Sequence, residues 1–107
     1  MPRYFIAYVG GNPPSTPAEG KEHMARYMTW LSSLGEAAVS PANPLRNTST
    51  IKPDGSVEDG GTTAMSGFTI LELDSMDAAL LAARTCPFLE VGGSLEVSEL
   101  IEMKPPG

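Results

Sequence analysis

The sequence holds a single histidine, His23, and its neighbours make it the best candidate for acid–base chemistry. It lies in a segment of helical periodicity, about 80° around from the centre of the apolar stripe, at the margin of the predicted core. Trp30, seven residues later, shares that margin, and Tyr27 lies between the two. Glu19 precedes His23 by four residues on the same face. A nearby carboxylate favours imidazolium, whereas partial burial opposes it. Imidazole suits general acid–base catalysis, but a histidine that merely covers the core edge also fits the pattern.

Three other groups of residues are weaker candidates. Cys86 is the single cysteine, so it cannot form a disulfide within the chain. It is predicted to end a helix, where exposed carbonyl groups disfavour a thiolate, and an inert structural thiol is the simpler interpretation. Residues 59–63 (DGGTT) could offer N–H groups to an anion or form a plain turn. Glu96 and Ser98 are predicted to face either a polar cavity between two sheets or solvent.

Several signatures of cofactor chemistry are missing from the sequence. It has no Gly-rich phosphate loop followed by lysine, no dinucleotide fingerprint and no nucleophile elbow. One histidine and one cysteine far apart in sequence do not make a zinc site of known spacing. Methionines at helical spacing are predicted to be core residues. We therefore expect no cofactor and no metal ion.

The composition is that of an acidic globular protein. The chain has 107 residues, with 13 Asp+Glu against 7 Lys+Arg, and the basic residues are scattered. Nucleic acids and anionic membranes are therefore not expected as partners, because both are bound through clustered positive charge. No apolar segment approaches the ~20 residues of a membrane span, and the first residues lack the features of a signal peptide. These observations predict a cytoplasmic protein.

Residues 3–9 (RYFIAYV) are predicted to form a strand that is apolar on both faces. The side chains alternate between two sets, namely Tyr4, Ile6 and Tyr8 on one face and Phe5, Ala7 and Val9 on the other. One layer of helices covers only one face of a sheet. A second copy of the same sheet is the economical cover for the other face, so we expect a homodimer.

The clearest helix is predicted over residues 17–34. Thr16 can cap its first turn, Pro17 suits the first helical position, and Glu19 completes a capping box. Gly35 is predicted to end the helix. The buried stripe is predicted from helical spacing to consist of Met24, Tyr27, Met28, Leu31 and Leu34.

The other elements are predicted from turn residues and periodicity. The first of them are a turn at 42–45, indicated by Pro41 and Pro44, a short polar strand at 47–51, and a turn-rich connection at 52–61 with candidate hairpin turns at 54–55 and 59–60. They are followed by a strand at 65–73 and a helix at 76–85 that ends before Cys86-Pro87. The last elements are a strand at 94–103, with Leu95, Val97, Ile101 and Met103 on one face, and a tail at 105–107. This order predicts a single α+β domain over residues 1–107, a ferredoxin-like βαββαβ unit. Such a unit has a four-stranded antiparallel sheet with two helices on one face.

The succession of motifs resembles the YCII-related domain family, including its DGPF-type members, over nearly the whole chain. The matching segments are 4–8 (YFIAY), 22–26 (EHMAR), 40–44 (SPANP), 66–72 (SGFTILE), 74–79 (DSMDAA), 86–87 (CP) and 92–97 (GGSLEV). In the family they correspond to an aromatic first strand, a helix that carries a histidine, a Pro-rich turn, a Gly-aromatic strand, an acidic-capped Ala-rich helix and a Gly-Gly, Glu-Val progression.

The resemblance implies a dimeric α+β barrel, in which two ferredoxin-like sheets pack face to face. The family is compared with muconolactone isomerase-like enzymes, and some members are proposed to use a His–Asp pair. His23 matches the histidine position, whereas Cys86 falls where the Asp of such members would stand. Residues 59–62 (DGGT) replace the DGPF signature.

Two functions are open at this point. The missing Asp favours a dimeric small-molecule-binding or regulatory domain of unassigned activity. The alternative is a cofactor-free enzyme, isomerase-, lyase- or oxygenase-like, with His23 as general acid or base. The expected ligand pocket consists of Tyr8, Tyr27, Trp30, Ser66 and Cys86.

Overall fold

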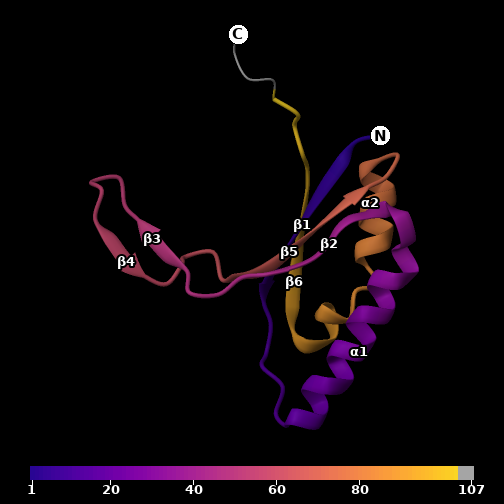
Figure 1. The fold of residues 1–107 in the computed structure, drawn as a ribbon, viewed down its shortest axis with the longest axis horizontal. Helices are drawn as coiled ribbons and strands as arrows, with labels where there is room; N and C mark the ends of the chain where they lie inside the picture. Colours follow the sequence, from indigo (N-terminus) through magenta and orange to yellow (C-terminus); the bar gives the residue numbers. More distant parts are fainter. Residues whose placement is uncertain (104–107) are drawn as a thin grey trace.

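A computed structural model describes residues 1–103, and the tail predicted at 105–107 lies outside these residues. The elements in chain order are β1 (Arg3–Gly10), α1 (Pro17–Leu34), η1 (Gly35–Ala37), β2 (Ala38–Pro44), β3 (Ser49–Ile51), β4 (Val57–Asp59), β5 (Met65–Glu72), α2 (Met76–Ala83), η2 (Pro87–Val91) and β6 (Gly93–Glu99). Four strands form an antiparallel sheet in the order β2-β5-β1-β6. Both helices lie on the same side of this sheet (Figure 1). The predicted ferredoxin-like α+β class is confirmed.

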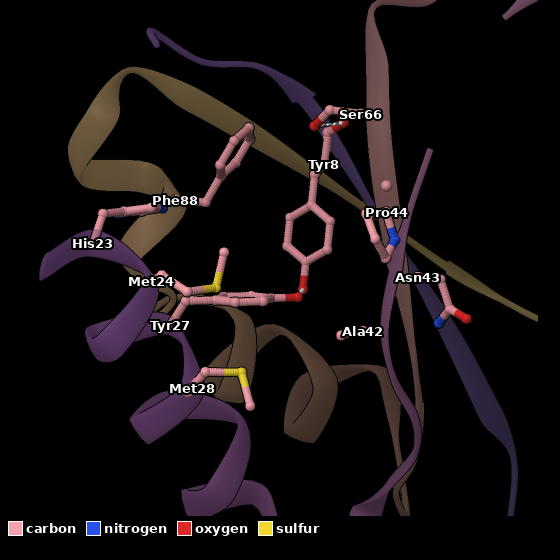
Figure 2. A pocket seen from close by; sticks show the side chains of 11 residues that line it. Tyr8, His23, Met24, Tyr27, Met28, Ala42, Asn43, Pro44, Ser66 and Phe88 are labelled. Carbon is pink, nitrogen blue, oxygen red and sulfur yellow. Dashed lines mark hydrogen bonds between the residues drawn. The ribbon is translucent and has the colours of Figure 1, made fainter. Parts of the chain in front are cut away.

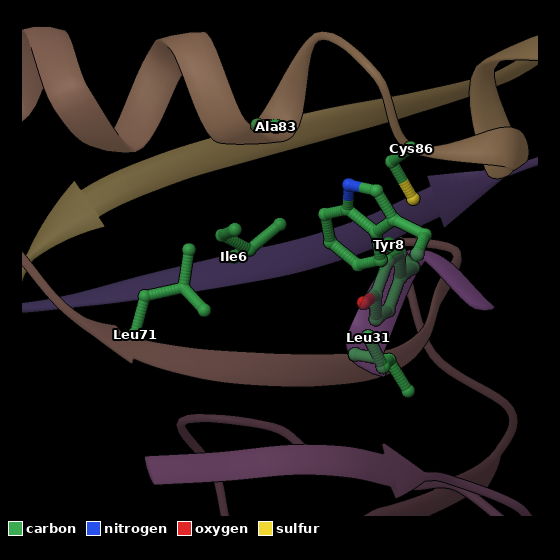
Figure 3. Packing of buried hydrophobic residues seen from close by; sticks show 7 residues of the cluster. Ile6, Tyr8, Leu31, Leu71, Ala83 and Cys86 are labelled. Atoms are coloured by element: carbon green, nitrogen blue, oxygen red, sulfur yellow. The ribbon is translucent and has the colours of Figure 1, made fainter. Parts of the chain in front are cut away.

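Strand β1 is central because its two apolar faces suit a position between β5 and β6. Ile6 and Tyr8 point toward the helices and are almost completely buried. They form a core cluster (Figure 3) whose other members are Trp30, Leu31, Leu71, Ala83 and Cys86. Burial of each large apolar side chain contributes about 1.5–3 kcal/mol. The cluster therefore fixes both helices against the sheet.

Helix α1 begins and ends where the capping residues predict. The Thr16 side chain accepts a hydrogen bond from the Glu19 backbone N–H at 3.1 Å. The Glu19 carboxylate reaches one residue further than expected and accepts from the Ser15 N–H at 3.0 Å. Gly35 adopts a φ of 56°, in the left-handed region that favours glycine.

The predicted buried stripe of α1 is wrong in its first half. Met24 and Met28 are 54% and 51% exposed, whereas Trp30, predicted at the margin, is buried beside Leu31. Tyr27 and Leu34 pack against the core cluster from its edge. Helix α1 is thus packed against the core mainly through its C-terminal half, and its N-terminal half borders a cavity.

The second strand of the sheet lies in a different place from the prediction. The first three residues of the expected turn at 42–45 belong to β2. Within the expected strand at 47–51, the last three residues form β3, which pairs with β4 in a separate hairpin. Two prolines are tolerated in β2 because it is an edge strand, where a missing N–H can face outward. Its pairing with β5 is also irregular on both sides of Ser40.

The hairpin β3–β4 turns at the first of the two predicted sites. Gly55, with φ of 87°, donates its N–H to the Lys52 carbonyl at 2.8 Å. Asp54 Oδ1 accepts from both the N–H and the hydroxyl of Ser56, which lowers the pKa of Asp54. The other candidate turn, residues 59–60, begins at the last residue of β4 and does not close the hairpin.

Strand β6 is shorter than predicted. It ends at Glu99, and Ile101 and Met103 are more than four-fifths exposed rather than on its apolar face. The Leu100 N–H donates to the Arg3 carbonyl at 2.8 Å, and Arg3 begins the neighbouring strand β1. Beyond Leu100, strand β1 therefore offers no further residue for β6 to pair with. Leu95 and Val97 pack against the core as expected.

The β3–β4 hairpin projects from the sheet on the side away from the helices (Figure 1). Every residue from 51 to 64 is exposed. The radius of gyration is 15.7 Å, against about 13 Å for a compact domain of this size. None of the helices within residues 1–103 has the length and apolar character needed to cross a membrane.

Candidate functional site

A cavity of about 290 Å³ lies between α1 and the strands β2 and β5 (Figure 2). Its walls are mostly apolar. They include the side chains of Met24, Met28, Ala42, Pro44 and Phe88. The volume lies near the lower end of the range of ligand pockets, so the cavity suits a compact small molecule.

Gly67 lets β2 approach β5 closely at the wall of the cavity. A Cβ atom at this position would lie 2.9 Å from the carbonyl oxygen of Asn43 on β2. Asn43 itself lines the cavity, and its Nδ2 donates to Ser40 Oγ at 2.9 Å and to the Phe68 carbonyl at 3.1 Å. The amide protons of Asn43 are thus used to hold the edge strand.

Three hydroxyl groups form a hydrogen-bonded chain beside the cavity. Tyr27 on α1 donates to the Tyr8 hydroxyl at 2.9 Å, and Tyr8 is hydrogen-bonded to Thr69 on β5. Thr69 donates to the Pro41 carbonyl at 2.5 Å. Burial raises the pKa of Tyr8 far above its ordinary value. The hydrogen-bonded hydroxyl groups therefore hold the Tyr8 phenol in its neutral form beside the cavity.

Aromatic side chains from separate elements enclose this phenol. The ring of Tyr8 meets Tyr27 edge-on at 5.8 Å and Phe88 edge-on at 5.4 Å. Edge-to-face pairs of this kind add about 0.5–1.5 kcal/mol beyond the area they bury. Tyr8, Tyr27 and Phe88 come from β1, α1 and η2, so the fold itself assembles the apolar wall.

His23 is half-buried and lines the cavity from α1 (Figure 2). Glu19, which was expected to influence it, has its carboxylate on the Ser15 N–H instead. In residues 1–103, no ion pair or hydrogen bond joins His23 to a carboxylate. Its imidazole can therefore accept or donate a proton toward the cavity without an acidic partner to orient it.

The structure brings four of the expected site residues, Tyr8, His23, Tyr27 and Ser66, to one cavity. Trp30 and Cys86 lie outside it, in the core. Trp30 Nε1 donates to the Ala82 carbonyl and the Thr85 hydroxyl, both at 3.1 Å. Burial raises the pKa of Cys86 to about 11. Trp30 therefore joins α1 to the rest of the core, and Cys86 joins the start of η2 to it.

Sequence reasoning missed Thr69, Asn43 and the two methionines of the cavity. Thr69 occurs in a segment already predicted as a strand, where threonine is common for its β propensity alone. Asn43 was assigned to a turn. Met24 and Met28 were assigned to the core, because periodicity identifies a helix face without showing how much of that face meets the sheet.

A second hollow, of about 470 Å³ and more open to solvent than the first, includes Arg26, Thr29 and Trp30 of α1. Arg26 pairs there with Glu90, and both side chains are about half exposed. Over residues 1–103, no three histidine, cysteine, aspartate or glutamate side chains lie close enough together to hold a metal ion.

The face of the sheet opposite the helices is also partly apolar. Phe5 and Phe68 stack on it with ring centroids 5.0 Å apart, and Val9 and Ile70 are half-buried beside them. No helix from the described part of the chain covers this face (Figure 1).

No family model and no curated protein matches this sequence. Among solved structures, the chain is similar to 5-chloro-2-hydroxyhydroquinone dehydrochlorinase (TftG) from Burkholderia phenoliruptrix AC1100, in complex with 2,5-dihydroxybenzoquinone. The TM-score is 0.57 at 20% sequence identity, over 94% of this chain and 95% of the other. The two proteins share a fold. At this identity the likeness assigns no residue role.

Proposed function

We propose that this chain is a small-molecule-binding domain whose ligand occupies the cavity between α1, β2 and β5. The observation that carries the proposal is the apolar cavity of about 290 Å³ with a chain of buried hydroxyl groups beside it. An apolar pocket with a few convergent polar groups is the usual form of a ligand site. The expected ligand is a compact ring compound with one polar substituent.

One further observation agrees with this proposal, and two others concern the family and the cellular location. The neighbour of the same fold is a dehydrochlorinase, solved with a hydroxylated quinone, so a protein of this fold can bind a hydroxylated ring compound. The motifs that resemble the YCII-related family span nearly the whole chain, and we propose membership of that family. The lone cysteine is buried as a thiol, which suits a cytoplasmic location.

A direct test uses the methyl groups of the methionines. In a protein labelled with ¹³C at the methionine methyls, 2-naphthol should shift the signals of Met24 and Met28, which line the cavity. The signals of Met1 and Met103, both more than three-quarters exposed, serve as internal controls. Assignment by Met24→Leu and Met28→Leu variants completes the design. Shifts at the controls alone, or at no methionine, would reject the proposal.

We also propose that a second copy of the chain covers the open face of the sheet. Phe5, Phe68 and Ile70 are half-exposed apolar side chains on one continuous surface, and a two-fold dimer pairs such a surface with itself. The β3–β4 hairpin projects on this same side (Figure 1). Isolated two-stranded hairpins are marginally stable, so contact with a second copy would support it.

Light scattering of two variants tests the dimer. Phe68→Asp places a charge on the open face, and the variant should have the mass of one chain, 11.3 kDa. Leu81→Asp is the matched control, because Leu81 is 66% exposed on α2, on the other side of the sheet. The control should keep the mass of two chains. A wild-type protein that is monomeric at micromolar concentration contradicts the dimer.

A cofactor-free enzyme is the second candidate function, because His23 lies on the cavity wall where it could exchange a proton with a ligand. The assay incubates the protein with 5-chloro-2-hydroxyhydroquinone and measures released chloride. Release that is lost in His23→Gln, with ligand binding retained, establishes catalysis by His23. No release from a protein that binds ring compounds favours the binding domain.

A further inference from the structure

The hydroxyl chain beside the cavity has a fixed direction. Its last acceptor is the Pro41 carbonyl, which has no proton to give, so the single proton of Thr69 must point to it. Thr69 can then only accept from Tyr8, whose own proton is used in that bond. Tyr8 in turn accepts from Tyr27. Every proton in the chain thus points away from α1.

This direction leaves Tyr27 without a proton for the cavity. Its single hydroxyl proton is donated to Tyr8 at 2.9 Å, so the Tyr27 oxygen has only lone pairs left for another partner. Figure 2 shows the two phenol oxygens next to one another between α1 and the strands. A hydroxyl that donates within such a chain becomes a better acceptor, because the bonds polarise one another. Tyr27 therefore offers an acceptor.

Neither of the nearby polar side chains on the strands supplies the missing donor. The Asn43 amide protons go to Ser40 and to the Phe68 carbonyl. The Ser66 hydroxyl donates, over a long 3.5 Å, to the Tyr8 carbonyl. His23 is the remaining polar group that lines the cavity.

We infer that the cavity selects ligands whose polar group is a neutral hydrogen-bond donor, a hydroxyl or an N–H, and disfavours carboxylates. This inference rests on the proposed ligand site. A donor on the ligand completes the chain at Tyr27. A carboxylate has acceptors only, so it meets the Tyr27 lone pair and gains no hydrogen bond there.

Three probes of matched shape test the inference on the wild-type protein, namely 2-naphthol, 2-methoxynaphthalene and 2-naphthoate. Each titration by calorimetry is repeated on a His23→Leu variant, because salt screens a pair inside a cavity only weakly and this variant removes any attraction between His23 and a carboxylate. We expect 2-naphthol to bind about 5- to 10-fold more tightly than the methyl ether, as the loss of one hydrogen bond predicts. The carboxylate should bind more weakly still.

The Tyr8→Phe variant tests the cause of the selection. Thr69 keeps its bond to Pro41 in this variant, but Tyr27 loses its inward acceptor and can turn its proton to the ligand. The binding constant of 2-naphthoate relative to 2-naphthol should therefore rise by about 5-fold or more. Tyr27→Phe removes the terminal acceptor, and the preference for 2-naphthol over its methyl ether should shrink.

The possible results separate this inference from the proposal beneath it. If none of the three probes binds, the ligand site itself is rejected, and the inference falls with it. If 2-naphthoate binds as tightly as 2-naphthol in His23→Leu, or if Tyr8→Phe leaves their ratio unchanged, the inference is overturned while the ligand site stands.

Discussion

Tyr27 on helix α1 donates its hydroxyl proton to Tyr8 on strand β1 at 2.9 Å, and the two rings meet edge-on at 5.8 Å. The pair links a half-exposed helix residue to the buried centre of the sheet. It is also where the core ends and the cavity begins. The same two residues therefore contribute to stability and shape the site.

Replacing the two tyrosines should cost different amounts of stability. Tyr8→Phe removes a hydroxyl with two hydrogen bonds in a buried place, and we expect a loss of about 1–3 kcal/mol. Tyr27→Phe removes one bond at the end of the chain and should cost about 0.5–1.5 kcal/mol. Urea denaturation of both variants measures the difference. Equal losses of stability in the two variants would mean that the three hydroxyl groups do not form one continuous hydrogen-bonded series.

The two halves of α1 should respond differently to truncation. Leu31 is buried in the core cluster, so Leu31→Ala should lower the free energy of unfolding by about 2–5 kcal/mol. Met28 is 51% exposed, and Met28→Ala should cost less than about 1 kcal/mol while weakening the binding of 2-naphthol. Urea denaturation and calorimetry test these effects. A large stability loss in Met28→Ala would place it in the core after all.

Stability should fall in alkali because of Cys86. Burial raises its pKa to about 11 in the folded protein, from an ordinary value of 9.0. Between these values the unfolded chain loses the thiol proton while the folded chain retains it, so rising pH favours unfolding. The loss should reach about 1 kcal/mol near pH 10. Cys86→Ala should flatten the fall between pH 8 and 10, and an unchanged slope would contradict the assignment.

Gly67 is predicted to be intolerant of any side chain. In Gly67→Ala the added carbon meets the Asn43 carbonyl at 2.9 Å, and the edge strand β2 must move. We expect a loss of about 1–3 kcal/mol, together with weaker ligand binding. Ser66→Ala, the neighbouring exposed position, is the matched control and should stay within about 0.5 kcal/mol of wild type. Thermal denaturation of both variants provides the comparison.

The local features of the fold could be predicted from the sequence because their signals are local. The cap at Thr16, the stop at Gly35 and the alternation in residues 3–9 are read within a few positions. Strand β2 was missed because its prolines suggest a turn, and only its place at the sheet edge makes them acceptable. That place is a property of the whole sheet.

Only part of the candidate site could be predicted, because the rest depends on which strands lie side by side in the folded sheet. Tyr8, His23 and Tyr27 stood out as an aromatic margin around a titratable group. Thr69 and Pro41 complete the hydroxyl chain, but they lie 28 residues apart and meet only after β2 pairs beside β5. Trp30 was predicted at the margin and Tyr27 in the buried stripe, yet Trp30 lies in the core and Tyr27 at the cavity.

A crystal structure of the protein soaked with 2-naphthol is the most direct test of the proposed ligand site. We predict the ring between Met24, Met28 and Phe88, with its hydroxyl donating to Tyr27 at an ordinary hydrogen-bond distance. Density for the ring in the second hollow beside Arg26, or on the open face beside Phe68, with the cavity empty, would contradict the account.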